Sequence, residues 1–254
     1  MATYKKRGYK PKNKEEENLL DKQESTTAEV FSSLDEGASK SEEWVSRNQN
    51  YILGVIGIIA VSVLGYMAYF QFVEKPRAAS AANEMLYPQQ YFDEALYASS
   101  EKDSLFTLAL NGAEGKYGFL DIIEEYNGTP AANLAKYSAG MAYLNMQKYD
   151  EAIKYLEGFS SKDLILGAVA KGGIGDAFLQ LNQPKEALDY YEKAVSHSTN
   201  EYTTPKFLYK AGVTALELDN KKKALKYFQR IKDEFPASEE ARTIDAFIGK
   251  AKSI

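Results

Sequence analysis

The segment AKGGIGDAFLQLNQPKEALDYYEKA (170–194) decides the fold, because two other segments repeat its pattern. They are AKYSAGMAYLNMQKYDEAIKYLE (135–157) and LYKAGVTALELDNKKKALKYFQRI (208–231). In each segment an alanine follows a glycine by twelve residues, and a large apolar residue follows the alanine by four. The residues in these three positions are Gly140, Ala152 and Leu156, then Gly175, Ala187 and Tyr191, then Gly212, Ala224 and Phe228.

This spacing predicts a helical hairpin in each segment. Small residues at the glycine and alanine positions let two antiparallel helices touch, and the large residues fill the gap to the neighbouring hairpin. A period of about 36 residues is typical of stacked hairpins, since one hairpin cannot bury its apolar face alone. The turns agree, because Pro184 suits a helix start and Asp219-Asn220 suits a break between helices. We therefore expect an all-α solenoid.

A second feature is the uncharged segment YILGVIGIIAVSVLGYMAYFQFV (51–73), in a chain whose residues are 26% charged. As a helix it would be about 35 Å long, enough to cross a hydrocarbon core of about 30 Å. A signal peptide cleaved near Ala79 or Ala81 is the alternative. The long preceding segment and the long apolar core favour an uncleaved signal-anchor.

One face of this helix carries small residues, within roughly 80° at 100° per residue. Such a stripe allows another helix to approach closely, so we expect a packing face for a membrane partner or a second copy. The frequency of glycine in membrane helices explains the same residues without a partner. The residues are Gly54, Gly57, Val61, Gly65 and Ala68.

Residues 1–50 are predicted to be a cytoplasmic polar tail, largely disordered, with short amphipathic helices. Basic residues in 1–14 suit anionic lipid or ribosomal RNA, but the glutamates that follow directly (15–17) favour a solvated tail. Thr26 and Ser39 are candidate helix starts, and Gly37 is a candidate stop. Basic residues close to the span are balanced on its two sides, and those further upstream favour a cytoplasmic N-terminus.

Composition argues against several functions. The chain has no cysteine and one histidine, His197, which leaves almost no material for zinc sites or His-based triads. Residues 74–254 contain 22 basic and 26 acidic residues, and this net charge of -4 does not suit nucleic acid. Gly173 and Gly175 begin like a dinucleotide loop, but no third glycine follows and no strand precedes them. We expect no catalytic residue, no metal and no cofactor, and so no enzyme.

The repeated pattern resembles the tetratricopeptide repeat across about residues 133–240. It departs from that repeat at the first aromatic position, where Lys136, Lys171 and Leu208 stand. The resemblance implies repeats in 133–254, preceded in 74–132 by a helical connector and a degenerate repeat that ends at Pro130. The predicted chain is thus a single transmembrane helix followed by a tetratricopeptide-repeat α-solenoid of helix hairpins.

The usual register of this repeat also implies a concave partner-binding groove on the first helix of each hairpin. Aromatic, methionine and amide side chains there suit adaptable contacts with an extended or partly unfolded chain. Packing against the neighbouring hairpin is the alternative role for some of them. The implied groove residues are Tyr137, Met141, Asn145, Asp176, Gln180, Lys206, Tyr209, Val213 and Glu217.

A short tail, one signal-anchor and a repeat solenoid together resemble the ancillary SecYEG translocon subunit family of bacterial inner membranes. The phrases FLDIIEEYNGTPAANLAKY (119–137) and TTPKFLYKAG (203–212) are similar to its members in Bacteroidota. The resemblance implies a periplasmic solenoid beside the translocon channel subunits (SecYEG) that binds emerging client polypeptides and periplasmic chaperones or prolyl isomerases. The alternative is a membrane-anchored scaffold for envelope assembly, in cell division or an outer-membrane secretion machine.

Overall fold

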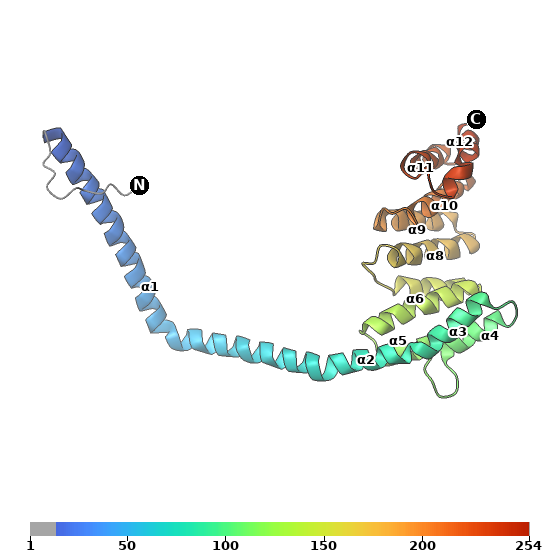
Figure 1. Cartoon of the computed structure of the whole chain (residues 1–254), viewed down its shortest axis with the longest axis horizontal. Helices are drawn as coiled ribbons and strands as arrows, with labels where there is room; N and C mark the ends of the chain where they lie inside the picture. Colours follow the sequence, from blue (N-terminus) through green and yellow to red (C-terminus); the bar gives the residue numbers. More distant parts are fainter. Residues whose placement is uncertain (1–13, 254) are drawn as a thin grey trace. The chain divides into compact units, whose positions relative to one another are not determined.

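The chain folds as α-helices joined by short turns in a computed structural model that describes the backbone of residues 14–253 and the side chains from residue 42 onward. Within that range there is no β-strand, only a single bridge between Ala113 and Lys116. Figure 1 labels most of the helices. Their bounds are α1 (Lys14–Tyr69), the π-helical turn η1 (Phe70–Glu74), α2 (Lys75–Glu84), α3 (Leu86–Tyr97), α4 (Lys102–Asn111), α5 (Phe119–Glu125), α6 (Pro130–Asn145), α7 (Tyr149–Glu157), α8 (Leu166–Gln180), α9 (Pro184–His197), α10 (Thr204–Glu217), α11 (Lys221–Glu234), the 3-10 turn η2 (Glu240–Thr243) and α12 (Ile244–Lys252).

The chain divides into two compact units, residues 1–70 and residues 71–254. In the first, α1 is one continuous helix from Lys14 to Tyr69, where the sequence predicted short helices in a largely disordered tail. Gly37 does not stop it, because a glycine inside a helix costs only about 1 kcal/mol and its neighbours favour helix. The predicted amphipathic faces of residues 14–41 and the basic tail of residues 1–13 lie outside what the structure describes.

One helix in the described part of the chain is long and apolar enough to cross a membrane. Its most apolar window lies in the helical stretch Glu42–Tyr97, has a mean hydropathy of 2.2, and is not buried among the described residues. Leu64 and Phe72 are 65% and 78% exposed, which would be costly in water and is favourable in lipid. The predicted single span therefore has a matching helix.

The second unit contains the three predicted hairpins, α6 with α7, α8 with α9, and α10 with α11, stacked in order and closed by α12 (Figure 1). Each repeat glycine lies beneath the large residue of its own hairpin. A methyl group added to Gly140, Gly175 or Gly212 would lie 2.5, 2.6 or 2.3 Å from the side chain of Leu156, Tyr191 or Phe228.

This geometry adds one detail to the prediction. The large residues reach the next hairpin as expected, since Leu156 packs with Ala170 and Ile174 of α8, and the Tyr191 ring stacks on Phe207 at 6.4 Å between ring centroids. They also cover the glycine within their own hairpin. The two helices of a hairpin therefore approach closely enough to exclude even a methyl group, which explains why glycine stands at this position.

The corner of each hairpin has one residue with a left-handed backbone. Gln147, Asn182 and Asp219 have φ angles of 60°, 57° and 55°. Pro184 then begins α9, where its missing N–H costs nothing, and the Asn220 side chain caps α11 by accepting from the Lys223 N–H. The turn residues picked out in the sequence thus end one helix and start the next.

The connector, α2 to α5, packs around aromatic residues. The ring of Phe92 makes edge contacts with Phe106 and Phe119, which are both fully buried. The degenerate repeat was expected to end at Pro130, but Pro130 is the first residue of α6, and Thr129 caps that helix by accepting from the Ala132 N–H. The proline therefore starts the first full repeat, as its fixed φ angle allows.

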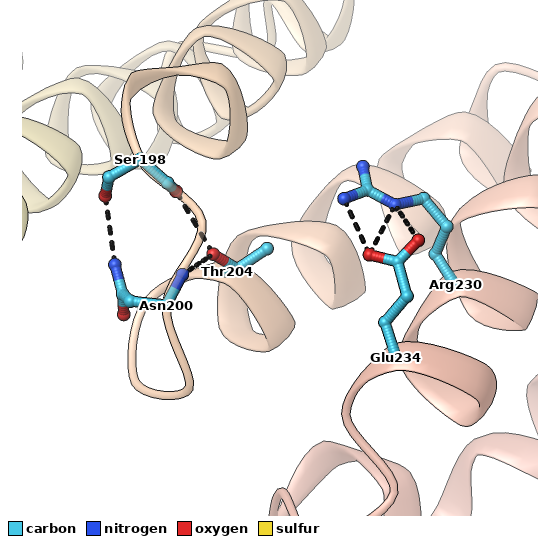
Figure 2. Close-up of polar contacts among 5 residues, drawn as sticks. All are labelled: Ser198, Asn200, Thr204, Arg230 and Glu234. Atoms are coloured by element: carbon cyan, nitrogen blue, oxygen red, sulfur yellow. Dashed lines mark hydrogen bonds and ion pairs between the residues drawn. The ribbon is translucent and has the colours of Figure 1, made fainter.

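Polar side chains hold the link between the second and third hairpins. Figure 2 shows Asn200 donating from its amide to the Ser198 hydroxyl at 2.9 Å and from its backbone N–H to Thr204 Oγ1 at 2.9 Å. These bonds fix the link at the start of α10, which carries the residues described next.

The same figure shows two nitrogens of the Arg230 guanidinium donating to the Glu234 carboxylate on α11, and these bonds lower the pKa of the Glu234 carboxyl.

Candidate functional site

A pocket of about 460 Å³ lies between α10 and the turn that precedes α12. Two of its residues, Lys206 and Tyr209, were predicted from the repeat register to line a groove. Two segments form the pocket, namely the beginning of α10 and the stretch around η2, which follows about one repeat later in the sequence. The pocket is lined by Lys206, Tyr209, Lys210, Glu239, Glu240, Arg242 and Thr243.

Tyr209 gives the pocket an aromatic wall that neighbouring rings hold in place. Its ring lies 5.0 Å from that of Phe247 on α12, edge to face, and 6.4 Å from that of Phe228 on α11. Phe228 is fully buried and Phe247 is half-buried, so two helices fix the position of the tyrosine. A wall of this kind offers a large contact area at little cost in conformational entropy.

The charges around the pocket have both signs. Lys206 and Arg242 are exposed cations, and Glu239 and Glu240 are acidic. No ion pair between described residues neutralises these four side chains, so they are available to polar groups of a partner.

Lys210, by contrast, is already engaged. Its Nζ lies 2.5 and 2.6 Å from the two carboxylate oxygens of Asp176 on α8, and Asp176 also accepts from the Tyr191 hydroxyl at 2.7 Å. Burial and this carboxylate raise the pKa of Tyr191 above its ordinary value. Asp176, predicted as a groove residue, thus ties α8, α9 and α10 together.

The predicted residues of the first repeat lie between hairpins. The half-buried Tyr137 places its ring 5.2 Å from that of Phe159 and belongs to a small apolar cluster with Leu156 and Ile174. Burial raises the pKa of the Tyr137 phenol. Met141 packs against the same cluster, and the Asn145 amide donates to the Met141 carbonyl at 2.9 Å. These side chains are largely occupied by packing, and they do not line the pocket.

The remaining predicted groove residues take different places. Gln180 and Glu217 are exposed, each at the last residue of its helix. Val213 is half-buried and packs against the core cluster formed by the last two hairpins and α12. The structure therefore gathers only Lys206 and Tyr209 of the predicted set at one cavity.

The predicted small-residue face lies on α1. A methyl group added to Gly54, Gly57 or Gly65 would meet no atom within 4 Å, and Val61 and Ala68 are exposed. No described residue of the first unit covers this face.

Four pocket residues, Glu239, Glu240, Arg242 and Thr243, were missed in the sequence. They follow Pro236 in a short charged stretch, SEEARTI (238–244), which has no helical periodicity. A solenoid needs a capping segment after its last hairpin, so this stretch could be expected to pack there. That expectation does not say which of its side chains face the hairpin.

From residue 42 onward, no three His, Asp or Glu side chains gather in a way that could hold a metal ion. His197 contacts the backbone carbonyl of Asp163 and the amine of Lys171.

The chain was also compared with known proteins. The family model described as Tetratricopeptide repeat matches residues 137–200 and again residues 173–239. No curated protein matches the chain. The two matches cover the three hairpins, and repeats of this kind act in general as non-enzymatic scaffolds for protein–protein interaction. The C-terminal part of this chain is therefore a tetratricopeptide-repeat solenoid, and it follows one helix that is able to span a membrane.

Proposed function

We propose that this protein is a membrane-anchored, non-enzymatic scaffold whose repeat domain binds polypeptides at the pocket beside Tyr209. The observation that carries the proposal is the pocket itself. It combines a fixed aromatic wall with unpaired charges of both signs, in a repeat whose general role is protein binding. An extended chain presents the matching groups, namely apolar side chains, charged side chains and backbone amides.

Site-specific crosslinking tests this proposal. A photoreactive group placed at Lys206 in full-length protein is expected to capture polypeptides, and Tyr209→Ala is expected to reduce the yield severalfold. Tyr202→Ala is the matched control, because Tyr202 is 78% exposed and does not line the pocket. Equal loss from both substitutions, or no loss from either, would contradict the proposal.

A finer proposal concerns the pathway. We infer that the protein is an accessory subunit of the Sec translocation machinery, in a bacterial inner membrane, with its N-terminus in the cytoplasm and its solenoid in the periplasm. The resemblance of residues 119–137 and 203–212 to that family supports it, together with the order of span and solenoid. Its partners would then be the lipid bilayer, the SecYEG channel subunits, emerging clients, and chaperones or prolyl isomerases.

The alternative is a scaffold for envelope assembly that serves cell division or an outer-membrane secretion machine. Purification in mild detergent separates the two, since recovery of channel subunits supports the first and recovery of only division or outer-membrane components supports the second. A reporter fused after residue 254 tests the orientation. Activity of that reporter in the cytosol would rule out both proposals.

The small-residue face of α1 is proposed as the contact with a membrane partner. Gly57→Leu is expected to weaken recovery of that partner, because a large side chain would prevent close approach of a second helix. Ile59→Leu changes an exposed position about 160° around the helix from the centre of the face, and is expected to leave recovery unchanged.

A further inference from the structure

A lysine and the only histidine of the chain meet within the second hairpin, beside the loop that precedes it. Lys171 lies on α8, with its Nζ 3.3 Å from His197 Nδ1 and 3.4 Å from the Gly167 carbonyl oxygen. His197 is the last residue of α9. This pair lies outside the pocket and has no part in the proposed polypeptide binding.

The tautomer of His197 follows from its second contact. Its Nε2 lies 2.9 Å from the backbone oxygen of Asp163, and a carbonyl oxygen only accepts hydrogen bonds. Nε2 therefore carries the proton, and Nδ1 presents its lone pair to the amine of Lys171. The imidazole is held in this position, because a methyl group added to Gly167 would lie 2.1 Å from Nε2.

The amine of Lys171 has no acidic partner. In the described part of the chain no carboxylate forms an ion pair with it, and the nearby Asp163 carboxylate accepts from the N–H groups of Ile165 and Leu166 instead. Lys171 is half-buried, and burial lowers the pKa of its amine. A desolvated amine beside a proton acceptor is the arrangement that makes a lysine nucleophilic.

We propose that Lys171 is an acyl-accepting nucleophile and that His197 takes the proton it releases, with a small acyl phosphate as the donor. The neutral Nζ attacks the carbonyl carbon, a C–N bond forms, and the C–O bond to phosphate breaks. The phosphate leaves with the electron pair of that bond. The proton lost by nitrogen passes to Nδ1, and the product is an N-acyl lysine.

The chain contains a matched control. Lys136 is the same residue type one repeat earlier, four residues before Gly140 as Lys171 is four residues before Gly175. It is also half-buried, and its side chain passes 3.4 Å from the place of a methyl group on Gly158. No imidazole lies beside it, because His197 is the only histidine. The two lysines therefore share residue type, repeat position and half-burial, and Lys171 alone has the imidazole beside it.

The experiment treats the full-length protein in detergent with acetyl phosphate near neutral pH. Mass spectrometry follows acetylation of each lysine with time, after digestion by a protease that does not cleave at lysine. Lys171 is expected to react several-fold faster than Lys136. In His197→Gln, whose amide can still donate to the Asp163 carbonyl, the rate at Lys171 is expected to fall to that at Lys136.

Equal rates at Lys171 and Lys136 in the unsubstituted protein would overturn the proposal. So would an unchanged rate ratio in His197→Gln with an unchanged circular dichroism spectrum. If that variant unfolds, every lysine reacts faster, and the ratio in the unsubstituted protein decides alone.

Discussion

Replacing Gly212 with alanine tests the contact on which every hairpin depends. The new methyl group would lie 2.3 Å from Phe228 Cε1, far inside van der Waals contact, and the ring is fully buried and touched by Tyr209 and Phe247. The ring has no free space to enter, so it must shift together with its neighbours. Overpacking of this kind costs about 1–3 kcal/mol.

Alanine also stabilises a helix relative to glycine, by about 0.5–1 kcal/mol. The expected net loss for Gly212→Ala is therefore about 0–2.5 kcal/mol in the free energy of unfolding. Gly249→Ala is the matched control, because Gly249 lies within α12 and a methyl group there meets nothing within 4 Å. That substitution is expected to gain about 0.4–1 kcal/mol.

The assay is urea unfolding of residues 71–254, which form a compact unit with its own cores, followed by circular dichroism. With a slope of about 2 kcal/mol per molar urea, a loss of about 1 kcal/mol lowers the midpoint by about 0.5 M. Combining Gly212→Ala with Phe228→Leu is expected to recover part of the loss, since the smaller side chain vacates the space. A midpoint for Gly212→Ala as high as that of Gly249→Ala would refute the close-contact explanation.

Three further outcomes are expected. Burial and a hydrogen bond to Glu157 raise the pKa of Tyr190 to about 12. The unfolded chain therefore loses this phenol proton first, near pH 10, and the free energy of unfolding falls as pH rises from about 10 to 12. In Tyr190→Phe, alkaline denaturation should show a shallower fall. Lys210→Met removes the cation beside Asp176. Because both side chains are about one-third exposed, the free energy of unfolding should fall by about 1 kcal/mol, and by less in high salt. Urea unfolding at two salt concentrations measures both values. Phe119→Ala empties a fully buried site against Phe92, and calorimetry should show a loss of about 3–5 kcal/mol.

The hairpins could be predicted because their determinants are local in sequence. Gly140, Gly175 and Gly212 each meet a side chain sixteen residues later, and that distance is set by helix geometry and a short turn alone. The uncharged span has the same property, since length and composition suffice to define it.

The pocket could be predicted only in part. Lys206 and Tyr209 follow from the repeat register, but the opposite wall comes from η2, whose position depends on how the chain folds back over Phe228 after Pro236. The contacts of Asp176 with Lys210 and of Tyr137 with Phe159 could not be predicted either. A repeat register assigns a side chain to a face of its helix, but it does not say which neighbouring side chain it will contact. Asp176 meets Lys210 thirty-four residues later, across a seam between repeats.

The side-chain hydrogen bonds between adjacent hairpins determine whether the solenoid could be extended by adding copies of a repeat. Glu157 with Tyr190 and Glu192 with Tyr227 are the same tie one repeat apart, whereas Asp176 with Lys210 occurs once. If the second hairpin were duplicated in tandem, Glu192 of the first copy would again find a tyrosine, at position 190 of the inserted copy. Asp176 of the first copy would face Gly173 in place of Lys210, and an extended array would need a lysine there to keep each added joint intact.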